Sequence, residues 1–106
     1  MPSESGYLSE AGRKLSEAGG KLSEADCKRA YWASRRGMLE LDLVLMPFAE
    51  ERLRELSADD QQRYVRLLES EDTELFAWFL QRERPQDLEL AAIIDVVLAH
   101  AHRTAR

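Results

Sequence analysis

The chain has 106 residues, 44% of them hydrophobic and 33% charged, and its formal net charge is −5. This length favours one domain. The acidic balance argues against nucleic acid as the main partner, because duplex binding relies on cations. The single cysteine, Cys27, excludes an intramolecular disulfide and a zinc site that needs a second cysteine. No apolar run is long enough to cross a bilayer, and the start lacks the apolar region of a signal peptide and is too acidic for a mitochondrial transit peptide, so we expect a cytoplasmic protein without membrane insertion.

The first part of the chain is a direct repeat. Leu-Ser-Glu-Ala occurs three times within residues 8–26, at a spacing of seven residues. This spacing is typical of a coiled coil, but alanine buries little, and each glycine between the copies costs a helix about 1 kcal/mol. We therefore predict a mobile low-complexity tail over 1–22 and a helical domain over 23–106. The last copy supplies Ser23 and Asp26, which match a capping box.

The first two predicted helices meet near a glycine. Gly37 suits the end of a helix, which places Arg35 and Arg36 in the last turn, where cations complement the helix dipole. Leucines alternate with other residues over 39–45, as in a strand. No second strand is available to pair with this segment, so we predict a helix that bends near Pro47.

Capping residues mark the next helices. Ser57 and Asp60 form a capping signal, Asp72 caps the following helix, and Pro85 suits the first turn of the last one. Helical spacing of apolar residues assigns Trp78 to the core. The predicted fold is all-α, a compact five-helix bundle after the N-terminal repeat tail. The five helices are expected at about 24–36, 38–55, 58–69, 73–83 and 85–102.

Residue patterns for catalysis are scarce. The sequence contains no glycine-rich phosphate loop, no H-E-x-x-H and no nucleophile elbow. His100 and His102 lie on different faces of the fraying end of the last helix, which does not favour a metal site. Lys28 beside Cys27 could activate the thiol, but we interpret Cys27 as an inert helix residue. We predict no catalytic, cofactor-binding or metal-binding residue.

One cluster, Arg36-Gly37-x-x-Glu40, has two interpretations. Arg36 and Glu40 could form an ion pair across the helix junction, worth a few tenths of a kcal/mol. The cluster could also be a recognition patch. In that patch arginine offers a planar fork of donors, Gly37 permits close backbone approach, and glutamate accepts hydrogen bonds. The physical chemistry of these residues alone leaves both interpretations open.

The residues around this cluster resemble a known family. The run from Arg35 to Asp42, followed by Met46-Pro47-Phe48, resembles the signature of the succinate dehydrogenase assembly factors, whose hallmark is R-G-x-x-E. The resemblance covers about residues 27–100. Further along the chain it includes Leu67-Leu68-Glu69, Asp72, Leu75-Phe76-Ala77-Trp78 and Pro85. By position, it implies that Arg36, Gly37 and Glu40 bind the partner, with Arg35 and Asp42 as neighbours.

The same resemblance implies a function. Members of this family bind the flavoprotein subunit of succinate dehydrogenase, and in some bacteria that of fumarate reductase, and promote covalent attachment of FAD to a client histidine. FAD then belongs to the client, and this chain is an accessory factor rather than an enzyme. Separately from the resemblance, the acidic surface and the full helix faces favour a monomer. The hypothesis is that Arg36 and Glu40 hold polar groups of the client so that histidine and flavin meet. The alternative is the antitoxin half of a toxin–antitoxin pair.

Overall fold

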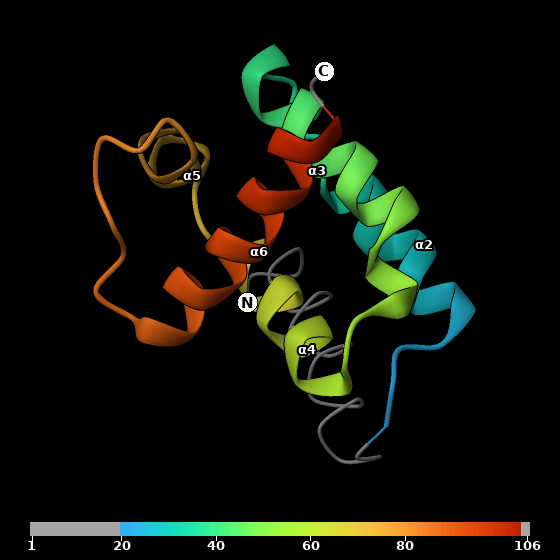
Figure 1. Ribbon diagram of the computed structural model, residues 1–106. Coiled ribbons are helices and arrows are strands. Elements are labelled where there is room, and N and C mark those ends of the chain that lie inside the picture. The colour runs from blue at the N-terminus through green and yellow to red at the C-terminus, as the bar shows by residue number, and fades with distance from the viewer. Residues whose placement is uncertain (1–19, 105–106) are drawn as a thin grey trace, which may run out of the picture.

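The computed structural model describes residues 20–104, which fold into five α-helices and one 3-10 turn (Figure 1). No strand occurs within this range, so the prediction of an all-α five-helix bundle is confirmed. None of the helices described is long and apolar enough to cross a membrane. The elements are α2 (Glu24–Ala33), α3 (Leu39–Glu51), η1 (Leu53–Glu55), α4 (Ala58–Leu67), α5 (Asp72–Phe79) and α6 (Leu88–Thr104).

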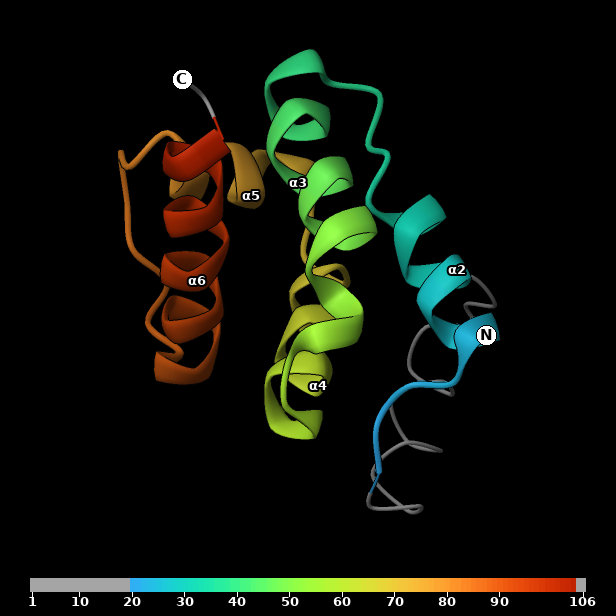
Figure 2. The same cartoon turned by 45° about the vertical axis from the view of Figure 1, so that its right-hand side comes forward.

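Helix α3 lies inside the bundle, between α2 and α6 (Figure 2). It also packs against α5, and α6 packs against α4 and α5. Helical spacing aims one apolar face of each helix at this centre, and the expectation that Trp78 packs against the core is confirmed. The side chains with no exposed surface include Leu45, Phe48, Leu53, Tyr64, Leu67, Leu75, Ile93 and Val97.

The predicted N-caps of α2 and α4 are confirmed. Ser23 Oγ accepts a hydrogen bond from the backbone N–H of Asp26 at 3.1 Å, and Ser57 Oγ accepts one from Asp60 at 3.2 Å. Each bond satisfies one backbone donor that the first helical turn leaves without a partner. For α5 the N-cap is Glu71 rather than Asp72, which is instead the first residue of the helix.

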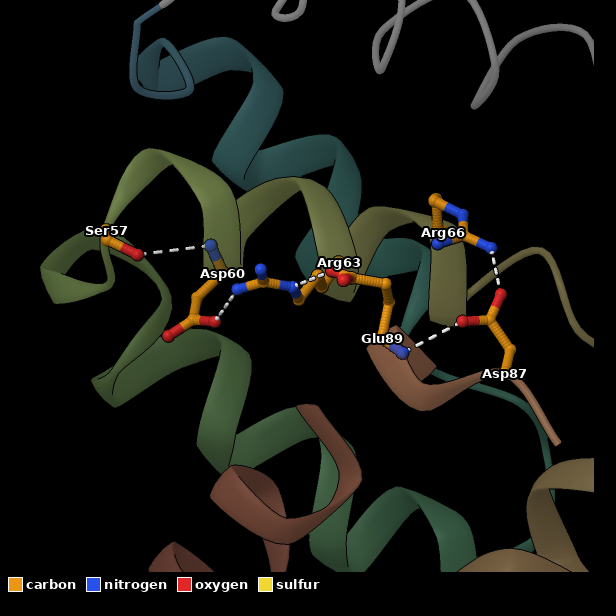
Figure 3. Close-up of polar contacts among 6 residues, drawn as sticks. All are labelled: Ser57, Asp60, Arg63, Arg66, Asp87 and Glu89. Carbon is orange, nitrogen blue, oxygen red and sulfur yellow. Dashed lines mark hydrogen bonds and ion pairs between the residues drawn. The ribbon is translucent and has the colours of Figure 1, made fainter. Parts of the chain in front are cut away.

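Helix α6 begins later than predicted. The carboxylate of Asp87 accepts from the N–H of Glu89 at 2.9 Å, and the carbonyl of Asp87 accepts from Ala91 at 3.0 Å. Asp87 therefore caps the start of the helix, directly before Leu88, and Pro85 lies in the preceding loop rather than in the first turn. Two arginines of α4 bind the same end of α6 (Figure 3).

These contacts join α4 to α6 at the surface. Arg63 pairs with Asp60 at 2.7 Å and also with Glu89, and Arg66 pairs with Asp87 at 2.6 Å (Figure 3). Exposed ion pairs of this kind contribute about 0–1 kcal/mol each. Their main effect is to fix where the long α5–α6 loop ends, because Asp87 is held by α4 and caps α6 at once.

The ends of four helices differ from the prediction: α4 ends at Leu67 rather than about 69 and α5 at Phe79 rather than about 83, and the ends of α2 and α3 differ too. Helix α2 ends at Ala33, so Arg35 and Arg36 lie beyond its last turn and Gly37 does not directly follow the helix. Ser34 is the C-cap: its backbone N–H makes the last i→i−4 hydrogen bond, to the carbonyl of Ala30 at 2.9 Å, and the next N–H, that of Arg35, donates to the carbonyl of Trp32 at 3.2 Å in a tighter turn. The buried hydroxyl of Ser34 also donates to the carbonyl of Ala30, at 2.8 Å. Helix α3 ends at Glu51, and the expected continuation to residue 55 is the separate turn η1.

The segment before α2 is partly packed. Leu22 falls within the predicted tail 1–22, yet it is only 9% exposed and belongs to the core. Its backbone N–H donates to Gln61 Oε1 at 2.8 Å, and Gln61 Nε2 donates to the carbonyl of Leu53 at 2.8 Å. The first two copies of the repeat, in residues 8–19, lie outside the described residues.

Candidate partner-binding site

The five predicted site residues occupy one connection, the turn between α2 and α3 and the start of α3 (Figure 2). Arg35, Arg36 and Gly37 form part of the turn, and Glu40 and Asp42 lie in the first turn of α3. The sequence prediction therefore selects residues that are neighbours in space. Their side chains, however, have different surroundings.

The guanidinium group of Arg36 is bonded inside the molecule. Its Nη1 donates to the carbonyl oxygens of Ala33 at 2.9 Å and Leu68 at 3.0 Å. Its Nη2 donates to the carbonyl oxygen of Ser70 at 3.0 Å, and its Nε donates to Asp72 Oδ1 at 2.8 Å. The cation thus lies at the C-terminal ends of α2 and α4, where the helix dipoles favour positive charge. Its partner Asp72 is the first residue of α5, where the dipole favours negative charge.

This geometry contradicts the interpretation of an Arg36–Glu40 ion pair. The carboxylate that binds Arg36 is Asp72, and only 15% of the Arg36 side chain remains exposed. A guanidinium group suits this position because its planar donors reach several acceptors at once. Arg36 therefore connects three helix ends.

The turn itself is closed by Asp42 and depends on a glycine. The backbone N–H of Arg36 donates to Asp42 Oδ1 at 2.7 Å. Gly37 has a φ of +81°, in the left-handed region that costs other residues roughly 1–2 kcal/mol. A β-carbon at Gly37 would meet no described atom within 4 Å, so backbone conformation, not space, requires glycine here.

The remaining polar residues of the cluster face outward. Glu40 and Arg35 are exposed, and neither side chain has a hydrogen bond or ion pair with any residue of the described range 20–104. Leu39 and Leu43, on the same outward side of α3, are also exposed. The surface of this turn thus consists of glycine backbone, one carboxylate, one guanidinium group and two leucines.

Ser34, which directly precedes Arg35 of the turn, makes a buried polar contact with α4. The hydroxyl of Tyr64 on α4 lies 2.6 Å from Ser34 Oγ and 3.3 Å from the carbonyl oxygen of Leu45 on α3. Burial raises the pKa of Tyr64 far above its usual value, so the hydroxyl keeps its proton and can donate. Sequence reasoning missed this contact and the Arg36–Asp72 pair, because the partners are 30 and 36 residues apart in the chain.

The other reactive side chains lie in the core. Cys27 is 3% exposed, and burial raises the pKa of its thiol, which agrees with its interpretation as an inert residue. His100 was expected at a fraying helix end, but its side chain is buried and only 5% exposed. Its Nε2 lies 3.1 Å from Glu51 Oε1. Among residues 20–104, no group of His, Cys, Asp and Glu side chains is arranged to hold a metal ion.

The fold places the chain among small all-α bundle proteins, and comparisons with known proteins define the class further. A family model described as flavinator of succinate dehydrogenase matches residues 28–101. The FAD assembly factor SdhE of Pseudomonas aeruginosa is 49% identical over 73 residues, which cover 69% of this chain and 87% of that protein. The protein of the same name from Vibrio cholerae is 51% identical over 72 residues, covering 68% of this chain and 84% of that protein.

A solved structure is similar as well. The solution structure of a UPF0350 protein superposes with a TM-score of 0.64 at 47% sequence identity, covering 79% of this chain and 90% of that one. The chain belongs to the family of flavinators of succinate dehydrogenase. The matched region contains every candidate site residue from Arg35 to Asp42.

Proposed function

We propose that the chain is an accessory factor that binds the flavoprotein subunit of succinate dehydrogenase and promotes covalent attachment of FAD to it. Membership of the flavinator family and the shared name of the relatives, FAD assembly factor, support this role over the antitoxin alternative. In this proposal FAD is the cofactor of the client, and the bond between flavin and protein forms within the client.

The observation that carries the proposal is the division of the R-G-x-x-E motif into an inner and an outer part. Arg36 is bonded to three helix ends, whereas Gly37 and Glu40 face solvent. We assign Arg36 and Asp42 a positioning role, because both hold the turn in place. Glu40 is the residue that contacts the client, and Gly37 allows the client backbone to approach the turn.

The contribution of the chain is then orientation. The Glu40 carboxylate accepts hydrogen bonds from a cationic or N–H group of the client and holds the docked client in one conformation. Keeping the reacting histidine and the flavin ring at attacking distance lowers the entropic part of the barrier. No proton transfer by this chain is required in such a step.

The experiment is covalent flavin fluorescence of the denatured flavoprotein subunit after incubation with FAD and this protein. We expect wild type to raise the covalent flavin signal, and Glu40→Ala to abolish most of this increase while remaining folded. Glu83→Ala is the matched control, because it removes an exposed glutamate from the α5–α6 loop, and it should act as wild type does. A full increase with Glu40→Ala, or none with wild type, would contradict the proposal.

A further inference from the structure

The last copy of the N-terminal repeat is anchored to the folded domain. Residues 21–24, here named the strap, directly precede the first turn of α2 and contact η1 and α4. The Nζ of Lys21 donates to the carbonyl oxygen of Arg54 at 2.8 Å. The backbone N–H of Leu22 donates to Gln61 Oε1 at 2.8 Å, and the side chain of Leu22 is 9% exposed and packs in the core.

The strap satisfies groups that would otherwise be left open. Gln61 is 1% exposed, and its Nε2 already donates to the carbonyl of Leu53 at 2.8 Å. Without the N–H of Leu22, its buried amide oxygen would lose its donor, which is costly. On the surface, the carboxylate of Glu24 accepts from Nε and Nη2 of Arg54, at 2.8 and 2.5 Å. The seat of the strap therefore consists of Arg54, Gln61 and the core space that Leu22 fills.

The residues of the strap occur once more in the chain. Residues 14–18 read Lys-Leu-Ser-Glu-Ala, and residues 21–25 have the same five residues in the same order. Every side chain that the strap directs at the seat therefore has an identical counterpart seven positions earlier. The first copy of the repeat follows Tyr7 rather than a lysine, so it lacks the cation that binds the carbonyl oxygen in η1.

The residues that follow each copy decide which one the fold prefers. Ser23 Oγ accepts from the N–H of Asp26 at 3.1 Å, and its carbonyl accepts from Cys27 at 2.9 Å, so α2 begins directly after Ser23. Cys27 is 3% exposed, which fixes this turn of the helix to the core. The corresponding residues after 14–17 include the two glycines at 19–20, which weaken a helix. The earlier copy thus matches the contacts of the strap with the seat but not the capped helix.

We propose that residues 14–17 are a reserve strap, which occupies the seat when residues 21–24 are displaced from it. Moving by one copy adds seven residues to the connection between the seat and the buried part of α2, and loop closure becomes only slowly more costly with length. Because the reserve strap is tethered to the same chain, its effective concentration exceeds that of a second copy. The N-terminal segment can then be released by one repeat while the core stays covered. This device is independent of the client and of the turn at Gly37.

The test compares the urea unfolding midpoints of serine variants of the full chain. Leu15→Ser alone should unfold as wild type does, because Leu22 fills the seat. Leu22→Ser should lower the midpoint only in part, because residues 14–17 then take the seat. The double variant has neither leucine and should lower the midpoint at least twice as far as Leu22→Ser alone. Leu8→Ser combined with Leu22→Ser is the matched control and should equal Leu22→Ser.

A photo-cross-linking residue in place of Lys14 reports which copy is seated. In the Leu22→Ser chain it should cross-link to η1 of the same molecule, and in wild type far less, because Lys21 contacts η1 there. A double variant with the midpoint of Leu22→Ser, or a Leu22→Ser chain that is unfolded without urea, overturns the inference. Cross-links between molecules, or a Leu22→Ser midpoint that rises with protein concentration, also overturn it, because a second copy then supplies the strap.

Discussion

At the scale of single residues, the structure places the two charged members of one motif in different surroundings. Arg36 donates to the carbonyls of Ala33, Leu68 and Ser70, and so satisfies acceptors that helix ends and loops leave open. Glu40 has no such partner among the described residues. Arg36 therefore serves the fold, and we propose that Glu40 serves a partner.

This difference predicts the effect of Arg36→Ala on stability. The substitution removes a mostly buried cation and leaves Leu68 and Ser70 carbonyls without their donor, which we expect to lower the free energy of unfolding by about 2 kcal/mol or more. Urea unfolding followed by circular dichroism measures it. Arg35→Ala is the control, because Arg35 is exposed, and it should change stability by less than about 0.5 kcal/mol. Equal midpoints for the two variants would contradict the internal role.

At the scale of helices, the capping residues of α2 and α4 were readable from the sequence, whereas that of α5 and the helix boundaries near tertiary contacts were not. Ser23 and Ser57 cap the helices that they were predicted to cap, because an N-cap bond is local. The C-cap of α2 is Ser34, whose hydroxyl lies 2.6 Å from that of Tyr64 in another helix. No spacing within α2 reveals such a partner. The same holds for Asp87, which α4 helps to place ahead of α6.

The contact between His100 of α6 and Glu51 of α3 predicts that the free energy of unfolding depends on pH. Burial lowers the pKa of His100, and Glu51 opposes this shift while Arg103 and Arg52 add to it. The unfolded chain protonates this imidazole below about pH 6.5, whereas the folded protein does so only at lower pH. The unfolded state then binds more protons, so the free energy of unfolding decreases as pH falls from about 6.5, until the folded pKa is reached.

Urea titrations at pH 7.5 and pH 5.5 test this dependence. His100→Gln should reduce the loss of stability between the two pH values, because it removes the group that titrates differently in the two states. His102 is exposed in the same helix, so His102→Gln should leave the loss as in wild type. An unchanged loss with His100→Gln would show that other groups cause it.

At the scale of the whole molecule, the apolar pattern and the caps sufficed to predict the all-α bundle. The leucines of 39–45 alternate as in a strand, but a lone strand could not satisfy its backbone, and the segment is helical. The motif selected candidate residues that lie together, in the turn between α2 and α3 and at the start of α3. Their roles were not readable, because Asp72 binds Arg36 across 36 positions and only the fold brings the two together.

The separate roles of Arg36 and Glu40 predict different responses of function to temperature. A small domain is marginally stable, so Arg36→Ala should lose covalent flavin formation at 37 °C through partial unfolding. Cooling toward about 15 °C, near the usual maximum of stability, should restore its folded population. Covalent flavin formation, relative to wild type at the same temperature, should recover with it.

Glu40→Ala should behave in the opposite way. Its circular dichroism should match wild type at both temperatures, because the exposed carboxylate has no hydrogen bond or ion pair within residues 20–104, and its covalent flavin signal should stay low at both. A folded but inactive Arg36→Ala at 15 °C would mean that Arg36 contacts the client itself. Recovery of Glu40→Ala on cooling would mean that Glu40 acts through stability, and the assigned roles would then be reversed.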